Sequence, residues 1–307
     1  MKKLIFIYLF FAFYSLNTFS MELIKVDKNI YMVEGTTGLP SPENKGFISN
    51  SYAVLTEKGW FVIDALSTPE LSEEFVKQLQ KVSKKPVKYI VVTHYHQDHW
   101  FGIKTYKNIG STIIAHKNLK SFYKSGNAEM MLEISNKNFG NIYKNVKLYP
   151  LDIVIENKSD IKFGGFTFKI YSMTPAHTNS DIVVHIPELK VLFVGDLVFY
   201  KRIPFAGDSN ASSKNWLKVL KQLKKFNAKL IFAGHNKPLN KESISFTENY
   251  LKFLREKISY YLDEGLEYDQ IKEKLKDTPY KVYPMYDVFH FKNIYKIYNE
   301  IEFEDFE

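Results

Sequence analysis

The densest group of chemically active side chains lies in the segment Thr93–Gly102, which reads THYHQDHWFG. It places His94, His96 and His99, three of the eight histidines of the chain, beside the carboxylate of Asp98. Neutral imidazole and carboxylate are the nitrogen and oxygen ligands that zinc accepts in proteins. This spacing therefore indicates a metal site that other parts of the chain must complete.

Three later side chains follow apolar segments in the same manner as this cluster. His177 lies within TPAHT, His235 lies within AGHN, and Asp196 follows the apolar segment Val191–Val194 after one glycine. Sites in α/β proteins are commonly built from loops at the ends of strands. We therefore expect these side chains to converge on the histidine cluster.

The spacing also suggests how the predicted ligands divide between two metal ions. His94 and His96 are two residues apart, so in extended backbone they lie on one side and can bind one ion, with His177 as third ligand. The predicted ligands of the second ion are Asp98, His99 and His235, with Asp196 as a bridge to the first. Two zinc ions roughly 3.5–4 Å apart can hold a shared hydroxide as nucleophile. Iron or manganese is the alternative metal, and cysteine ligands are excluded because the chain has none.

Hydrophobic patterning predicts two sheets packed together with helices outside, because each half of the chain contains strands followed by a helix and a strand. The apolar segment directly before the histidine cluster is typical of a buried strand. Strands are expected at 22–33, 51–55, 60–63, 87–92, 112–115, 151–155, 166–172, 182–186, 191–194 and 229–233. Helices are expected at 69–82, 117–138 and 214–226, and at 242–276 with a break near Gly265.

The N-terminus is typical of a secretory signal peptide over residues 1–20. Lys2 and Lys3 precede the apolar run Leu4–Leu16, and small residues follow up to Ser20. The run is shorter than the roughly 20 residues of a membrane span, so no stable span is expected in the mature chain. A periplasmic or secreted protein is predicted, and a retained N-terminal anchor is the alternative. The lack of cysteine excludes a lipid-anchored lipoprotein and disulfides.

The net charge of +8 is spread along the chain. No basic stripe interleaved with aromatic residues is present, so a nucleic-acid partner is not expected. The predicted partner is a small-molecule substrate.

The motif HYHQDH resembles the HxHxDH signature of the metallo-β-lactamase superfamily. His177, Asp196 and His235 match its later metal positions, and the resemblance extends from about Glu22 to the C-terminus. It implies an αββα sandwich, two mixed β-sheets flanked by helices, with a dinuclear zinc site at its edge. It also implies a catalytic domain over 21–240, a C-terminal helical extension over 241–307 packed on it, and the same seven metal ligands.

The resemblance implies hydrolysis of an ester, thioester, lactone or amide by a metal-bridging hydroxide, with Asp98 and Asp196 as catalytic residues. Asp64 resembles the aspartate with which the superfamily orients its ligands, and the alternative is a turn residue at a strand end. Arg202 is placed to hold a substrate carboxylate, and the alternative is a surface salt bridge. His116, His185 and His290 are interpreted as structural residues.

Downstream of Asp196, the segments GDLVFYKRIP, WLKVL and DVFH are similar to the quinoprotein relay system zinc metallohydrolases. That similarity implies partners in a periplasmic redox pathway. A β-lactamase proper and a low-turnover metal-binding accessory protein remain as alternatives. The Gly-rich and Pro-rich loop Gly35–Asn50 is expected either to cover the mouth of the site or to serve only as a connector.

Overall fold

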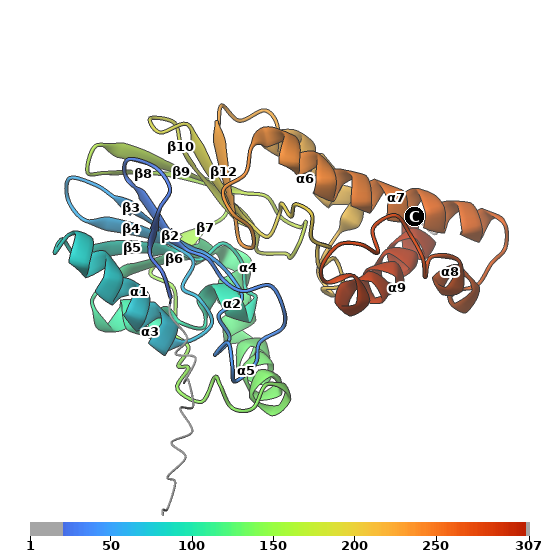
Figure 1. Cartoon of the computed structure of the whole chain (residues 1–307), viewed down its shortest axis with the longest axis horizontal. Helices are drawn as coiled ribbons and strands as arrows, with labels where there is room; N and C mark the ends of the chain where they lie inside the picture. The colour runs from blue at the N-terminus through green and yellow to red at the C-terminus, as the bar shows by residue number, and fades with distance from the viewer. Residues whose placement is uncertain (1–20, 305–307) are drawn as a thin grey trace, which may run out of the picture.

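The computed structural model describes residues 21–304 and has two β-sheets stacked face to face, with helices on both outer faces (Figure 1). This arrangement confirms the predicted αββα fold. The predicted signal peptide lies outside the described residues. Among those described, no helix is both long and apolar enough to cross a membrane.

The first sheet has seven strands in the order β1-β2-β3-β4-β5-β6-β7. Neighbours are antiparallel from β1 to β4 and parallel from β4 to β7. The strands are β1 (Ile24–Lys25), β2 (Ile30–Val33), β3 (Ser51–Leu55), β4 (Trp60–Ile63), β5 (Val87–Val91), β6 (Thr112–His116) and β7 (Ile153–Ile155). The helices between them are α1 (Pro69–Val82), α2 (Gln97–Trp100), α3 (Ile103–Asn108), α4 (Lys117–Lys124) and α5 (Asn127–Asn138).

The second sheet has five strands in the order β12-β11-β10-β9-β8, antiparallel except for the β11–β12 pair. Its strands are β8 (Lys158–Phe163), β9 (Phe166–Ser172), β10 (Ile182–Ile186), β11 (Val191–Gly195) and β12 (Leu230–Ala233). The helical segments that belong to this half are α6 (Ser213–Leu223), η1 (Lys241–Ser243), α7 (Ile244–Asp263), α8 (Tyr268–Lys274) and α9 (Tyr286–Glu304).

Apolar side chains fill the space between the two sheets and the space under the helices on each side. Between the sheets, Phe61 of β4 stacks on Phe168 of β9 with ring centroids 3.7 Å apart. All four residues of β4 are buried because both faces of the strand are covered. On the other side of the first sheet, α1 buries Leu71, Phe75 and Leu79, which recur at helical spacing.

Helix boundaries differ from the sequence expectation where a glycine turns the chain. The helix expected at 117–138 is two helices, separated by Gly126 with φ of 81°. That left-handed conformation suits glycine, which has no β-carbon to clash. The break near Gly265 is present as expected, between α7 and α8. The strand β8 was not foreseen, because it alternates polar and half-buried residues, whereas the long helix α9 lies within the predicted helical extension, although its bounds were not predicted.

Four strands end side by side at one edge of the sandwich. β4 and β5 are parallel in the first sheet, and β11 and β12 are parallel in the second, so their C-terminal ends point the same way within each sheet. The residues that follow these ends include Asp64, Asp196 and His235, as well as the Thr93–Gly102 segment. These strand ends thus gather Asp64 and all the predicted ligands except His177, which lies in the loop between β9 and β10.

Candidate metal centre

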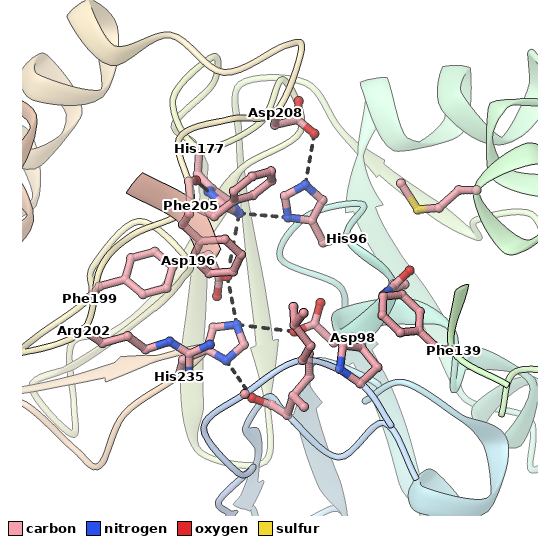
Figure 2. Close-up of a pocket in the computed structure, with 17 residues that line it drawn as sticks. His96, Asp98, Phe139, His177, Asp196, Phe199, Arg202, Phe205, Asp208 and His235 are labelled. Atoms are coloured by element: carbon pink, nitrogen blue, oxygen red, sulfur yellow. Dashed lines mark hydrogen bonds and ion pairs between the residues drawn. The ribbon is translucent and has the colours of Figure 1, made fainter. Parts of the chain in front are cut away.

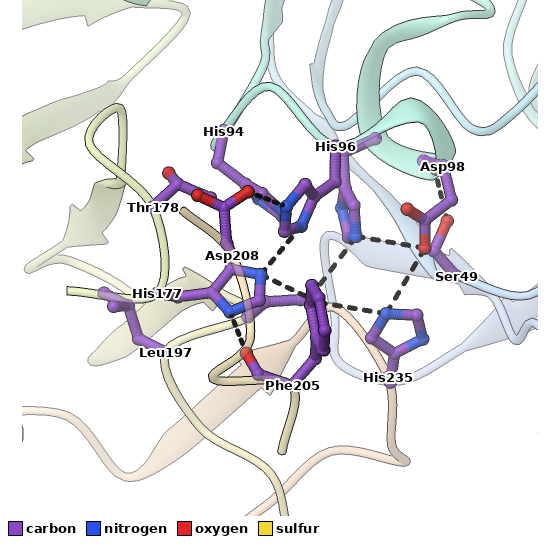
Figure 3. A network of polar contacts seen from close by, with 12 residues as sticks. Ser49, His94, His96, Asp98, His177, Thr178, Leu197, Phe205, Asp208 and His235 are labelled. Atoms are coloured by element: carbon purple, nitrogen blue, oxygen red, sulfur yellow. Dashed lines mark hydrogen bonds and ion pairs between the residues drawn. The ribbon is translucent and has the colours of Figure 1, made fainter. Parts of the chain in front are cut away.

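The seven predicted ligands meet at this edge. Figure 2 and Figure 3 together label all of them except His99. Within the described residues, three groups have potential ligand atoms that all lie within 4.8 Å of one another. They are His94 with His96 and His177, His94 with His99 and Asp196, and Asp98 with His99 and His235. The structure therefore brings the predicted residues together, while their role as metal ligands stays a prediction.

His96 and His177 face each other, and when both rings are neutral the two facing nitrogens carry lone pairs. Nδ1 of His177 donates to the carbonyl oxygen of Phe205 at 2.9 Å, and Nε2 of His96 donates to Asp208 at 3.0 Å. A neutral imidazole has one N–H, so the other nitrogen of each ring carries a lone pair. Those two nitrogens, Nε2 of His177 and Nδ1 of His96, are 2.9 Å apart. A cation between them would satisfy both lone pairs.

His99 and His235 are oriented in the same manner. Nδ1 of His99 donates to Asp64 at 2.9 Å, and Nδ1 of His235 donates to the carbonyl oxygen of Ile48 at 2.7 Å. Their Nε2 atoms point inward to the carboxylates, at 3.3 Å from Asp196 for His99 and at 3.3 Å from Asp98 for His235. Outer hydrogen bonds of this kind fix the ring orientation of metal-binding histidines.

Several buried atoms of the cluster have no hydrogen-bond partner within the described residues. They are Nε2 of His94, Nε2 of His99 and Oδ1 of Asp196. Leaving a buried polar atom unpaired costs about 1–3 kcal/mol, so native structures seldom tolerate three of them together. His94 is otherwise oriented through Nδ1, which lies 3.1 Å from the hydroxyl of Thr93. Five imidazoles and two carboxylates of this arrangement fit zinc, which takes nitrogen and oxygen ligands.

The electrostatics of the cluster also favour a cation. Burial would raise the pKa of Asp98, but His99 and His235 outweigh it and hold that pKa well below its usual range. The pKa of Asp196 is likewise lowered by His235 and His99 against the effect of burial. Burial lowers the pKa of His177 to about 3, so this imidazole is neutral at physiological pH. Ionised carboxylates and neutral imidazoles are the protonation states that bind metal.

Asp64 has features of both interpretations that the sequence left open, a turn residue at a strand end and a residue that orients a ligand. It follows β4 in a left-handed turn with φ of 65°, and its carboxylate is buried. One oxygen accepts the backbone N–H of Thr93 at 2.7 Å, and the other lies 2.9 Å from Nδ1 of His99. Asp64 is thus a turn residue whose side chain also holds His99 and the start of the histidine segment.

Gly234 leaves no space for a side chain beside the cluster. A β-carbon at this position would lie 2.0 Å from Oδ1 of Asp196 and 2.7 Å from Cε1 of His99. The backbone of Gly234 passes this close to the two ligands because β12 ends directly before it. Glycine at this position is therefore required by the packing of the cluster.

A pocket of about 310 Å³ opens over the cluster. The loop 35–50 lies at its mouth through Gly38, Leu39, Pro40 and Ile48, as one reading of the sequence expected. Phe47 of the same loop is buried among apolar side chains of the first half of the chain. The other lining residues are His96, Gln97, Asp98, Met131, Phe139, His177, Asp196, Phe199, Arg202, Phe205, Asp208, His235 and Phe289.

Arg202 lies inside this pocket, so the alternative of a surface salt bridge is wrong. Its side chain is 6% exposed, and Figure 2 shows it beside Phe199 and His235. Within residues 21–304, the guanidinium makes no ion pair or hydrogen bond, and its Nε is fully buried. Burial lowers the pKa of Arg202. An unpaired buried cation of this kind is suited to bind an anionic group of a ligand.

Asp208 was missed in the sequence. It accepts from the hydroxyl of Tyr95 at 2.5 Å and from the backbone N–H of Asn210 at 2.8 Å, while its other oxygen faces His96. No pattern in one sequence separates it from any other aspartate in a polar loop. The aromatic lining was missed as well, because Phe205 and Phe289 are far apart in sequence and meet only in the fold.

The remaining histidines lie outside the cluster, as expected. His116 contacts the backbone of Asn118 and the hydroxyl of Ser172. His185 lies on β10, with Nε2 3.3 Å from the carbonyl oxygen of Asn227. His290 is buried in α9, between the hydroxyl of Tyr250 and the carbonyl oxygen of Leu275.

Comparison with known proteins agrees with this geometry. Residues 44–235 match the family model described as the metallo-beta-lactamase superfamily. Over 238 residues the chain is 24% identical to a metallo-beta-lactamase type 2 of Bacillus cereus, covering 76% of this chain and 84% of that protein. It is also 21% identical over 260 residues to a linear primary-alkylsulfatase of Pseudomonas sp. (strain ATCC 19151). That match covers 73% of this chain, which spans about half the length of the alkylsulfatase.

Among solved structures, the sec-alkylsulfatase Pisa1 from Pseudomonas sp. superposes with a TM-score of 0.73. The superposition covers 91% of this chain and 50% of that chain, at 17% sequence identity. At this identity the likeness concerns the fold alone. The helices α7, α8 and α9 lie beyond the residues that match the family model.

Proposed function

This chain belongs to the metallo-β-lactamase superfamily, and on that premise we propose that it is an exported hydrolase with two zinc ions that cleaves an ester, thioester, lactone or amide. The observation that carries the proposal is the orientation of the histidines. At least four of the five rings direct one nitrogen outward to a hydrogen-bond acceptor and the other inward to a shared centre. Such preorganised rings are expected of a metal site and serve no purpose in an ordinary core.

Zinc bound at these side chains would supply Lewis-acid chemistry, which polarises a carbonyl and lowers the pKa of water. The chain supplies the remaining functions. Asp98 is ionised and faces the centre, so it can accept a proton from the attacking water. Arg202 can pair with an anionic group of the substrate and so fix its position. Phe199 stacks on His235 at 5.8 Å between centroids and excludes water from that side.

Export is proposed from the N-terminal sequence, with residues 1–20 as signal peptide and the periplasm or the exterior as destination. An association with a periplasmic quinoprotein pathway is proposed from the segments after Asp196 that are similar to quinoprotein relay hydrolases.

The test is hydrolysis by the purified mature chain loaded with zinc. The substrates are 4-nitrophenyl acetate, a thioester, a lactone and an anilide. We expect turnover of at least one, loss of it on treatment with a chelator, and recovery on addition of zinc. Asp98→Asn should lower kcat about 100-fold or more, because it removes the proposed proton acceptor and also alters a predicted zinc ligand. The exposed Asp269→Asn on α8 is the matched control and should leave kcat unchanged. No turnover of any substrate would contradict the hydrolase and favour a metal-binding accessory protein.

A β-lactamase is the second candidate, because a metallo-beta-lactamase type 2 is among the relatives at 24% identity. A chromogenic cephalosporin added to the same panel separates the two. Turnover of the cephalosporin with kcat/KM well above that of the simple ester would favour the lactamase. The reverse order would favour the broader hydrolase.

A further inference from the structure

The C-terminal helix α9 lies beyond the residues that match the family model, yet it reaches the pocket. Phe289 of α9 lines the pocket and contacts Phe205, with ring centroids 5.1 Å apart. The two rings meet at an angle of 44° and form one apolar surface. α9 therefore contributes directly to the wall of the site.

Asn293, one helical turn further along α9, holds the peptide groups on both sides of Phe205. Its Oδ1 accepts the backbone N–H of Ala206 at 2.7 Å, and its Nδ2 donates to the carbonyl oxygen of Pro204 at 2.8 Å. Asn293 is completely buried, and Nδ2 also contacts the hydroxyl of Tyr250 at 3.0 Å. A buried amide with this many partners rigidifies the segment that it binds.

The same segment carries Arg202 into the pocket. The backbone N–H of Ile203 donates to the carbonyl oxygen of Pro284, directly before α9, at 3.0 Å. On its other side the segment meets the metal centre, because the carbonyl oxygen of Phe205 accepts Nδ1–H of His177. Residues 202–206 are thus fixed between the C-terminal extension and the predicted ligands.

The charges and apolar groups of the pocket define a ligand class. Figure 2 shows Arg202 and Phe199 on one side of Asp98 and Asp196, Phe205 above, and Phe139 on the opposite side. Met131, Phe139, Phe205 and Phe289 supply apolar surface, and Arg202 supplies an unpaired cation. A ligand that fills the pocket therefore carries one anionic group and an apolar chain or ring.

We propose that α9 forms part of the substrate-binding wall, with Asn293 as positioning residue for the Arg202–Phe205 segment and Phe289 as a contact for the apolar part of an anionic amphiphilic substrate. The proposal rests on the proposed function, since it assumes that substrate binds in this pocket. In this proposal the C-terminal helices contribute to the choice of substrate and do not bind metal.

The test is binding of 1-octanesulfonate to the zinc-loaded mature chain by isothermal titration calorimetry, with methanesulfonate as comparison. Neither probe is an ester or amide, so binding is measured apart from turnover. We expect octanesulfonate to bind at least tenfold more tightly than methanesulfonate. Phe289→Ala should weaken octanesulfonate about tenfold, because a buried aromatic contact is lost. Arg202→Met should weaken the binding of both sulfonates.

Phe303→Ala is the matched control, since Phe303 lies on the same helix and is 71% exposed. It should bind octanesulfonate as the unmodified chain does. Asn293→Asp keeps the size and one acceptor but loses the amide N–H groups, and it should weaken octanesulfonate about tenfold while zinc content stays the same. A merely structural role for Asn293 would lower thermal stability without changing the ratio of the two sulfonate affinities.

Three results would overturn the inference. They are equal affinity for the two sulfonates, no binding of octanesulfonate by the unmodified chain, and wild-type affinity in both Phe289→Ala and Asn293→Asp. Failure of the proposed function has a different signature, which is absence of zinc or of turnover in the unmodified chain. Octanesulfonate binding with the expected variant pattern, in a chain that turns over none of the four test substrates, would leave the inference about the pocket wall standing and remove the hydrolase.

Discussion

Single residues around the metal centre owe their orientation to partners that are not themselves predicted ligands. His96 is oriented by Asp208, His99 by Asp64, His177 by the backbone of Phe205 and His235 by that of Ile48. Such partners raise the basicity of the ring and reduce the entropy lost on metal binding. The predictions at this scale therefore concern Asp208 and Gly234, which contact the ligands from outside.

Asp208→Ala should weaken zinc binding by about 10–100-fold, because the ring of His96 loses the acceptor that fixes it. The measurement is competition for zinc with a chromophoric chelator. Asp269→Ala, an exposed aspartate on α8, is the control and should keep wild-type affinity. Equal affinities in the two variants would show that Asp208 has no part in holding the site.

Gly234→Ala should remove zinc from a chain that remains folded. The added methyl group would lie 2.0 Å from Oδ1 of Asp196, so ligand and backbone must separate. Gly234 is not among the residues with positive φ, so the effect is steric and not a backbone penalty. Metal analysis and circular dichroism check this together, and a variant with full zinc content would refute the steric argument.

At the scale of elements, the sequence predicted most strands and the αββα layers, because the apolar segments and the alternation of apolar with polar residues were clear. It predicted the seven clustered residues, since each follows a strand or lies in a loop directly after one. It placed α9 only within a helical extension and did not predict its bounds, because the buried residues His290 and Asn293 are polar and weaken the apolar pattern. Nor did it predict the partners of the histidines, because contacts such as Asp208 with His96 join loops 112 residues apart.

Ion pairs at the junction of α6 and α7 are expected to make the stability of the fold depend on pH. Glu248 of α7 pairs with Lys224, which follows α6, and with Lys252 at 2.7 Å. Burial raises the pKa of Glu248, but the two lysines outweigh it and lower that pKa overall. A carboxyl group with a lowered folded-state pKa stabilises the fold above its unfolded pKa, and this stability is lost as pH falls.

Glu248→Gln should therefore lower the free energy of unfolding at pH 7 by about 0.5 kcal/mol, a value limited by solvent screening. The difference should shrink as pH falls below about 4.3, where the unfolded chain takes up a proton, and vanish only below the lowered pKa of Glu248 in the folded chain. Urea unfolding at several pH values measures it. Glu256→Gln on the exposed face of α7 is the control. A difference that persists unchanged at low pH would contradict the ion-pair account.

For the whole molecule, the candidate metal centre lies where the two sheets and the loops of both halves meet. Without a cation, the buried carboxylates of Asp98 and Asp196 depend on protonated imidazoles, because Asp98 and Asp196 raise the pKa of His99 despite its burial. Ligands that bind only the folded state stabilise it in proportion to the logarithm of their concentration. Metal removal should therefore affect the stability of the entire sandwich.

A chelator should lower the melting temperature of the chain, and zinc at about 1,000 times its Kd should restore about 4 kcal/mol of stability. Magnesium should not substitute, since it prefers oxygen ligands in octahedral geometry. Differential scanning calorimetry with each metal checks both statements. A melting temperature that is insensitive to chelator would show that no metal holds the two halves together.

Elemental analysis of the purified mature chain tests the central claim most directly, beside the variants His96→Ala and Asp196→Ala. We predict two zinc ions per chain, with less in His96→Ala and least in Asp196→Ala, whose carboxylate lies near both His99 and His177. No bound metal, or a metal content that neither substitution changes, would contradict the account.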